Sequence, residues 1–374
     1  MTNANLKKIP RRLFLLSSAA LAGGALAFGG ASAAFAQTKT LRIASGESDS
    51  PTGTMDPAFN QIDADAARIS LVYERLIILD KNFTPQPQLA ESWASNDAGD
   101  VWTIKLKPGI DFQNGKRMSA ADVVYTYRRL IDPSTASAVA ATFAAMTQNG
   151  IEAIDEHTVR FTLGSPIIEF PSLIANRFTY IVPDGSTSEE LRTKGIGTGP
   201  FKVEEFVPGR EPSVFVKNDN YWRKGLPKVD RVELRSIADS SARISALLTG
   251  QIDLSWDVPR VGLRALKDAP NITVASVPAP YVMSLTMWVD KPPFDDVRVR
   301  EAMKIVVDRQ KMIDLVLSGL GQPASDHPVA SWIQYGAKEP APQRDVARAK
   351  QLLAEAGHPN GIDVELHTSE AIPG

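Results

Sequence analysis

Apolar and polar positions alternate in several short stretches of the chain, and this pattern predicts β-strands. The clearest examples are residues 101–106 and 158–163, where every second side chain is apolar. Each of these two stretches fits a strand with one buried face, because successive side chains of a strand point to opposite sides of the sheet. Comparable runs predict further strands at residues 41–44, 214–217, 229–237, 272–277 and 364–366.

Apolar residues three and four positions apart predict helices between these strands. One apolar face runs from Ile69 through Val72, Tyr73 and Leu76 to Ile77. A second helix opens at a capping box that begins at Ser119 and ends at Asp122. The mixture, which lacks strict alternation and internal repeats, predicts a mixed α/β fold.

Two more helical patterns lie in the last eighty residues. One begins at Asp295 and continues through Val307. A further helical pattern follows it, and Gly319 is its predicted C-cap. The other spans 344–356, with Leu352 and Leu353 facing inward.

The first 36 residues have the features of an export signal. A basic segment from Lys7 to Arg12 precedes an uncharged apolar stretch, and Ala34-Phe35-Ala36 fits a small-x-small cleavage site. The pair Arg11-Arg12 followed by Leu13-Phe14-Leu15 resembles the twin-arginine motif. We expect cleavage near Ala36. An uncleaved membrane anchor is the alternative, but a stretch dominated by Ala, Gly and Ser inserts weakly.

Composition narrows the class of protein. Of the 374 residues 43% are hydrophobic and 22% are charged, as in ordinary globular proteins. The first 36 residues hold four of the 41 basic residues and no acid, so the remainder has 37 basic against 43 acidic residues, a net charge of −6. This balance predicts no nucleic-acid partner. Because the chain has no cysteine, disulfides, thiolate nucleophiles and a lipid-modified cysteine are excluded.

No motif of an enzyme stands out. The four histidines, at positions 157, 327, 358 and 367, lack metal-ligand spacing, and the chain has no Gly-x-Ser-x-Gly motif. Gly195, Gly197 and Gly199 do not have the spacing of a phosphate-binding loop. We expect no enzyme activity, cofactor or metal. An exported hydrolase with a carboxylate pair remains an alternative, as does a secreted interaction module.

Several segments together resemble the family of extracytoplasmic solute-binding proteins for dipeptides, oligopeptides and nickel complexes. The resemblance covers nearly everything from Leu41 onward. The segments are Met55-Asp56-Pro57-Ala58, Val72-Tyr73-Glu74-Arg75-Leu76, Leu89-Ala90-Glu91-Ser92-Trp93, Gly109-Ile110-Asp111-Phe112, Ser119-Ala120-Ala121-Asp122-Val123, Gly197-Thr198-Gly199-Pro200-Phe201, Asn220-Tyr221-Trp222, Gly250-Gln251-Ile252-Asp253-Leu254, and the run from Pro292 to Arg300.

The resemblance implies a two-lobed fold of the periplasmic-binding-protein type, with a hinge. It assigns residues 37–270 to a first lobe, with an inserted subdomain at about 80–195, and residues 271–374 to the start of a second lobe. Family members usually continue further, so we expect this second lobe to be incomplete and the main charged anchors for the ligand to lie beyond residue 374.

The resemblance also implies which residues face the ligand. Gln61 could bind a peptide backbone and Asp63 could pair with an amine, unless both merely face water at a helix start. Pro200-Phe201 and Tyr221-Trp222 are expected to be structural. The other candidate ligand-binding residues are Ser255, Trp256 and Asp257, followed by Tyr281, Met283 and Trp288, with packing in the core or on a sheet surface as the alternative.

The function that the resemblance implies is that of the periplasmic substrate-binding component of an ABC importer. It would bind a short peptide or peptide-like solute, as a monomer, and deliver it to the transmembrane permease subunits. A nickel chelate, an opine or a sugar is the alternative solute, because one scaffold hosts several ligands. The Tat translocase would be a partner only during export.

Overall fold

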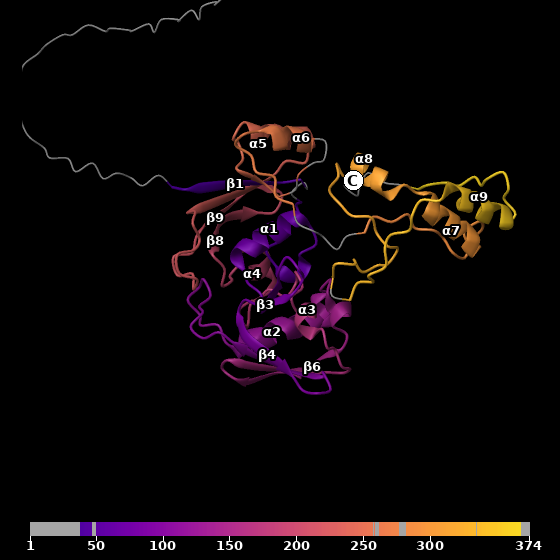
Figure 1. Ribbon diagram of the computed structural model, residues 1–374. Coiled ribbons are helices and arrows are strands. Elements are labelled where there is room, and N and C mark those ends of the chain that lie inside the picture. Colours follow the sequence, from indigo (N-terminus) through magenta and orange to yellow (C-terminus); the bar gives the residue numbers. More distant parts are fainter. Residues whose placement is uncertain are drawn as a thin grey trace, which may run out of the picture. The chain divides into compact units, whose positions relative to one another are not determined.

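The computed structural model describes residues 38–46, 50–256, 258, 262–276, 282–333 and 335–367 (Figure 1). The predicted export signal at residues 1–36 lies outside these ranges. Within them, no helix combines the length and the apolar character needed to cross a membrane.

A five-stranded sheet carries the N-terminal strand at an interior position. Its order is β11-β1-β10-β9-β8. Strand β1 runs parallel to both of its neighbours, whereas β9 runs antiparallel to its neighbours β10 and β8. Figure 1 shows α1 beside this sheet, and α1 contacts β8. The strands are β1 (Thr40–Ser45), β8 (Phe201–Val207), β9 (Arg210–Lys217), β10 (Arg231–Ser236) and β11 (Leu254–Ser255), and the accompanying helices are α1 (Asp63–Val72), α4 (Ser188–Thr193), α5 (Ser240–Leu248) and α6 (Leu263–Asp268).

One core joins α1 to this sheet. Ile69 and Val72 of α1 are fully buried against Phe215, Val232 and other apolar residues of the strands. Burial of such side chains stabilises each by about 1.5–3 kcal/mol relative to exposure. The apolar spacing of α1 and the alternation in the strands are therefore both explained by this core.

A second, antiparallel sheet has the order β4-β5-β7-β6 and is covered by α2. Alternation places Trp102, Ile104 and Leu106 of β5 inside, and Tyr127 of α2 meets Phe161 edge to face at 5.1 Å. The elements are β4 (Ala90–Ser95), β5 (Val101–Leu106), α2 (Ala120–Ile131), β6 (Met146–Asp155), β7 (Thr158–Leu163) and α3 (Phe170–Leu173), with a two-stranded pair β2 (Ile77–Leu79) and β3 (Pro85–Pro87) and short 3₁₀ helices at Pro57–Phe59, Pro133–Thr135 and Ala140–Phe143.

Residues 282–367 contain three helices and a small core of their own. The helices are α7 (Val297–Val306), α8 (Arg309–Val316) and α9 (Val346–Glu355). Figure 1 shows α7 and α9 side by side, and they pack through Ala302, Ala349 and Leu352. Asp296 and Asp345 cap α7 and α9 with their side chains.

Most predicted elements are confirmed. Strands occupy 40–45, 101–106, 158–163, 210–217 and 231–236, and the capping box opens α2 with both reciprocal bonds present. Helices α7 and α9 agree with the periodic pattern. Helix α8 ends at Val316, with Leu317 as its C-cap residue. Gly319 lies two residues further with a φ of 76°, and its backbone N donates to Ile313 O at 3.2 Å, so it helps to close the last turn.

The helix predicted through Ile77 is too long. It ends at Val72, whose carbonyl oxygen accepts hydrogen bonds from Gly199 N at 2.8 Å and Gln113 Nε2 at 3.2 Å. Leu76 and Ile77 are still buried, but Ile77 already belongs to β2. Tertiary donors therefore outcompete continuation of the helix.

Two predicted strands are wrong. Residues 272–276 and 364–366 have extended-type sequences but no ladder in the structure, and Val364 and Leu366 are exposed. A strand exists only when it is paired, and the described residues place no strand beside either segment. The predicted division into two lobes and a subdomain stays a prediction.

Candidate functional site

Three parallel strands, β10, β1 and β11, have their carboxyl ends together on one side of the five-stranded sheet, which is called the sheet edge below. Ser45 of β1 lies opposite Ser236 of β10, and Ala44 lies opposite Ser255 of β11. The chain leaving β10 donates from Ile237 N to Ser45 O at 2.9 Å. In open α/β sheets ligands bind outside the carboxyl ends of parallel strands. This edge is therefore the candidate ligand site.

An unsatisfied hydroxyl marks the same edge. Ser236 Oγ is buried and has no hydrogen-bond partner among the described residues, although Ser236 N donates to Glu211 Oε1 at 2.7 Å. Such a hydroxyl can donate to or accept from a polar group of a solute. Ser236 was not among the predicted site residues, although its place at the end of the run 229–237 could have indicated it.

Trp256 follows directly after β11 at this edge. Its backbone N donates to Ala44 O at 2.9 Å, which fixes the residue beside the end of β1. The side chain is 51% exposed, so the alternative of core packing does not hold. Ser255 is half-buried in β11 itself. Asp257 lies outside the described residues.

The other predicted residues of this group are Tyr281, Met283 and Trp288. Tyr281 lies outside the described residues. Met283 and Trp288 are 50% and 70% exposed in a segment without regular structure, and Lys291 Nζ lies 5.1 Å from the Trp288 ring centroid. Core packing therefore does not hold for either side chain, and their place in a ligand pocket stays a prediction.

Gln61 and Asp63 lie together at the start of α1, beside an arginine that sequence reasoning missed. Arg177 Nη2 donates to the backbone oxygen of Gln61 at 2.8 Å, and Arg177 Nη1 is 3.9 Å from Asp63 Oδ1. All three residues are exposed or nearly half exposed. The sequence holds no signal for this contact, because the partners are 116 residues apart.

Glu74 is a buried carboxylate that accepts several side-chain hydrogen bonds. Its Oε2 accepts from Trp222 Nε1 at 2.6 Å and Thr198 Oγ1 at 3.0 Å, and its Oε1 accepts from Tyr221 OH at 2.8 Å. Burial raises the pKa of Glu74, and the bonds from Trp222 and Tyr221 oppose that rise. Three of the signature segments thus meet at one structural anchor, which supports the structural role expected for Tyr221 and Trp222.

Asp56 is a second structural carboxylate. It is buried, accepts from Ala58 N at 3.1 Å and forms a two-pronged ion pair with Arg129 at 2.9 and 2.5 Å. Such a paired arrangement holds the loop that precedes α1. The Met55-Asp56-Pro57 segment therefore positions Gln61 and Asp63 and does not itself face solvent.

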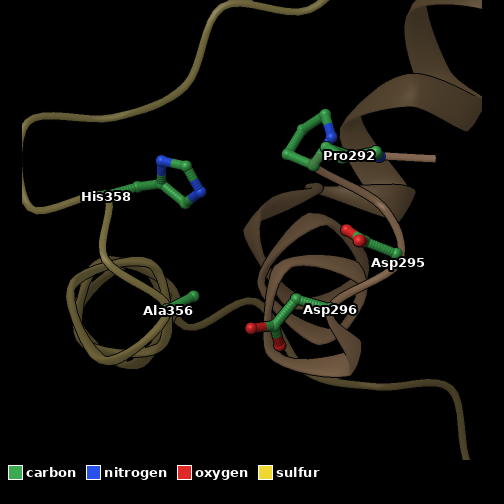
Figure 2. Close-up of a pocket in the computed structure, with 6 residues that line it drawn as sticks. Pro292, Asp295, Asp296, Ala356 and His358 are labelled. Carbon is green, nitrogen blue, oxygen red and sulfur yellow. The ribbon is translucent and has the colours of Figure 1, made fainter.

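A cavity of about 370 Å³ lies between the start of α7 and the end of α9 (Figure 2). Asp295, Asp296 and His358 face it together with Pro292 and Ala356. Asp296 accepts hydrogen bonds from Arg298, and these bonds lower the pKa of Asp296 to about 2. None of the predicted site residues lines this cavity.

No group of three metal-binding side chains occurs in the described ranges. Two of the histidines contact a glutamate instead: His327 Nε2 is 3.1 Å from Glu339 Oε2, and His367 Nε2 is 3.6 Å from Glu365 Oε1. The two histidine and the two glutamate side chains of these pairs are all exposed. Exposed pairs of this kind contribute little to stability or chemistry.

Comparisons with known proteins agree with this geometry. The sequence model of the bacterial extracellular solute-binding proteins, family 5, matches residues 84–372. The glutathione-binding protein GsiB of Escherichia coli K12 is 30% identical over 320 residues, which are 84% of this chain and 62% of that protein. The chain thus spans less than two thirds of the length of this relative.

Solved structures of the same kind match in three dimensions. A nickel ABC transporter protein from Bacillus halodurans is 31% identical with a TM-score of 0.69, covering 85% of this chain and 64% of that one. The binding protein DppA of Helicobacter pylori, in complex with the peptide STSA, is 27% identical with a TM-score of 0.68, covering 86% and 67%. These matches confirm the predicted mixed α/β fold of periplasmic binding proteins.

Proposed function

The chain belongs to family 5 of the bacterial extracellular solute-binding proteins, and on this premise we propose that it captures a small solute outside the cytoplasm for an ABC importer. The observation that carries the proposal is the sheet edge formed by β10, β1 and β11. There a half-exposed Trp256 follows Ser255 of β11, and Ser236 ends β10 on the other side of β1. An indole wall with nearby hydroxyls suits a small ligand with polar groups.

The solute that we propose is a short peptide or a peptide-like compound. Among the relatives, one is named for glutathione and one was solved with the peptide STSA. A nickel chelate is the first alternative, because another match is a nickel transporter protein. An opine is the second, since MoaA of Agrobacterium tumefaciens R10, solved with mannopinic acid, is 27% identical with a TM-score of 0.65. A sugar is the third.

The proposed mechanism is binding without chemistry. GsiB, DppA and the Bacillus halodurans protein, which support this proposal, are named as binding or transport proteins. The solute would favour the conformation that binds it best and would then be passed to the permease subunits. We further propose that Gln61, Asp63, Ser255, Trp256, Asp257, Tyr281, Met283 and Trp288 contribute to this binding.

The compartment is part of the same proposal. The basic start, the apolar stretch and Ala34-Phe35-Ala36 favour export by the twin-arginine route and cleavage near Ala36, giving a monomer in the periplasm. N-terminal sequencing of the protein recovered from the periplasm tests this. A mature N-terminus at Gln37 supports it, and a protein retained in the membrane at its full length contradicts it.

Calorimetric titration tests the binding function. We expect one class among short peptides, glutathione, nickel chelates, opines and sugars to bind, and to stabilise the protein by about 2.7 kcal/mol at a hundredfold excess over its Kd. Trp256→Ala should weaken that binding roughly tenfold or more, because a half-exposed indole would lose its contact area with the solute.

The control is Ile154→Ala, which removes an apolar side chain of similar exposure (45%) from β6 and should leave the Kd unchanged. Mass spectrometry of the recovered solute separates binding from hydrolysis. A cleaved solute would establish the hydrolase alternative, and the absence of binding by every class would end the proposal.

A further inference from the structure

A short loop in the last part of the described chain carries two aromatic side chains that contact residues far earlier in the sequence. The loop, called the aromatic loop below, comprises residues 330–333 and 335–336. The ring of Trp332 lies 5.5 Å from the ring of Phe83, centroid to centroid, at an interplanar angle of 53°. Tyr335 donates from its hydroxyl to Glu169 Oε1 at 2.6 Å, across 166 residues of sequence. The aromatic loop thus joins segments that only the tertiary fold brings together.

The aromatic loop is shaped by its own backbone hydrogen bonds. Ile333 N donates to Ala330 O, and Gly336 N donates to Ile333 O, both at 3.0 Å. A Cβ on Gly336 would lie 1.9 Å from Ala330 O, so this close turn requires glycine. Trp332 and Tyr335 are therefore presented by a closed turn, which limits the positions that their rings can take.

The two residues that receive these rings belong to one surface beside the second sheet. Phe83 lies in the turn between β2 and β3, and Glu169 directly precedes α3, which contacts β2. The first residue of α3, Phe170, is fully buried, and its ring centroid lies 5.2 Å from that of Phe161 in β7. Glu169 is therefore attached directly to a residue of the core, and the surface is a fixed part of the fold.

The backbone of Phe83 is unusual for a bulky residue. Its φ is 62°, in the left-handed region that such residues rarely occupy. Asp80 closes the turn, because its Oδ1 accepts from Asn82 N at 2.8 Å and from Thr84 N at 3.0 Å. Glycine would adopt this conformation without steric cost. A phenylalanine at this position is explained by a contact of its ring, and the ring of Trp332 lies beside it.

We infer that the aromatic loop is a latch, which holds residues 282–367 against the surface formed by the β2–β3 turn and the start of α3. An aromatic pair contributes roughly threefold to tenfold to such an equilibrium, so the latch favours the docked state without making it permanent. The latch does not depend on a solute. Its bearing on solute capture rests on the proposed function, because a solute shifts a conformational equilibrium that the latch already biases.

Spin-label distance measurements on the whole, solute-free protein test the latch. The protein has no cysteine of its own, so labels attach only at Ala121→Cys in α2 and Ala354→Cys in α9, two exposed helical positions. Phe83→Gly removes the ring and places at this φ the residue that best tolerates it, so the turn is retained. This variant should raise the ratio of undocked to docked molecules roughly threefold to tenfold.

Two further variants separate a direct contact from an indirect effect. Trp332→Ala should match Phe83→Gly, and the two together should do no more than either alone, because partners in one contact are not additive. Tyr335→Phe removes only the hydroxyl and should raise the same ratio roughly twofold to fivefold. Lys81→Ala removes an exposed side chain from the same turn and is the matched control, which should leave the distances unchanged.

The outcomes separate the latch from the binding function. Unchanged distances in Phe83→Gly and Trp332→Ala overturn the latch, and so do fully additive effects in the double variant. Neither result affects the titration of solutes, by which the proposed function is tested. A second, undocked population in these variants, together with no binding of any solute, establishes the latch and ends the proposed function. Melting curves of all variants establish that they are folded.

Discussion

Glu74 shows how a carboxylate can be kept inside this chain. Only 2% of it is exposed, yet Trp222, Tyr221 and Thr198 all donate to it, so the loss of hydration is offset by hydrogen bonds. Because its pKa is raised in the folded protein, the folded state holds this proton more tightly than the unfolded state does. Its contribution to stability therefore falls as the pH rises through the folded pKa.

Replacing this side chain should be costly. In Glu74→Ala four donors lose their acceptor, and we expect the free energy of unfolding to fall by about 2–4 kcal/mol. Glu205→Ala removes an exposed carboxylate that pairs with Arg210 and should cost at most about 1 kcal/mol. Urea denaturation measures both. Equal losses in the two variants would show that the Glu74 cluster is not an anchor.

Asp296 gives the opposite dependence on pH. Its pKa is lowered to about 2 by Arg298, from an ordinary value of 3.8, so its contribution to stability is complete above pH 4 and is lost as the pH falls towards 2. NMR titration of its carboxyl carbon should give a midpoint near pH 2, and Arg298→Gln should return it towards the ordinary value. A midpoint near 3.8 in the wild type would show that Arg298 does not bind Asp296 in solution.

Sequence reasoning could place some candidate residues and could not find others. Trp256 could be placed because it follows Gly250-Gln251-Ile252-Asp253-Leu254, a segment that resembles the family pattern. Arg177 could not, because its contact with Gln61 arises only when α1 packs near residues 176–178. Pairings across 116 residues leave no mark in local spacing.

Among the elements, predicted strands formed where a partner strand is present and failed to form where none is present. The alternation at 101–106 and 158–163 became β5 and β7, which pair with each other. The same kind of pattern at 364–366 formed no strand. Local pattern thus indicates suitability for a sheet, and pairing decides the result. The end of α1 at Val72 was missed for a related reason, since its carbonyl is engaged by Gly199.

That close approach predicts a sensitive position. A Cβ on Gly197 would lie 2.1 Å from Val72 O, a backbone atom that cannot move freely. Gly197→Ala should therefore destabilise the protein by about 1–3 kcal/mol. At Gly164 the nearest atom to a Cβ would be Ala145 O at 3.5 Å, so Gly164→Ala should have little effect in the same denaturation experiment. Comparable stabilities of the two variants would refute this account.

Across the molecule, burial is distributed unevenly. The cores around the two large sheets contain many fully buried aromatic and aliphatic side chains, whereas α7 and α9 share a core of Ala302, Ala349 and Leu352. The fold class could be predicted because mixed patterns require sheets with helices against them. The distribution of burial could not, since it depends on which elements meet.

Local stability should follow this distribution. Regions with few buried contacts open at lower free energy, so amides of α7 and α9 should exchange with deuterium at least about tenfold faster than those of β5 and β7. Hydrogen-exchange mass spectrometry of the whole protein measures this directly. Equal protection of the two regions would mean that the small core is as stable as the large ones.

The interior position of β1 has a further effect during synthesis. Arg42 is bound by Asp253, 211 residues later in the chain, and β1 cannot pair on that side before β11 has been made. At ordinary rates of translation this takes roughly ten to forty seconds. Until β10 has been made, shortly before β11, the apolar side chains of β1 have no sheet to enter, so the nascent chain depends on being kept from aggregation until its middle portion has emerged.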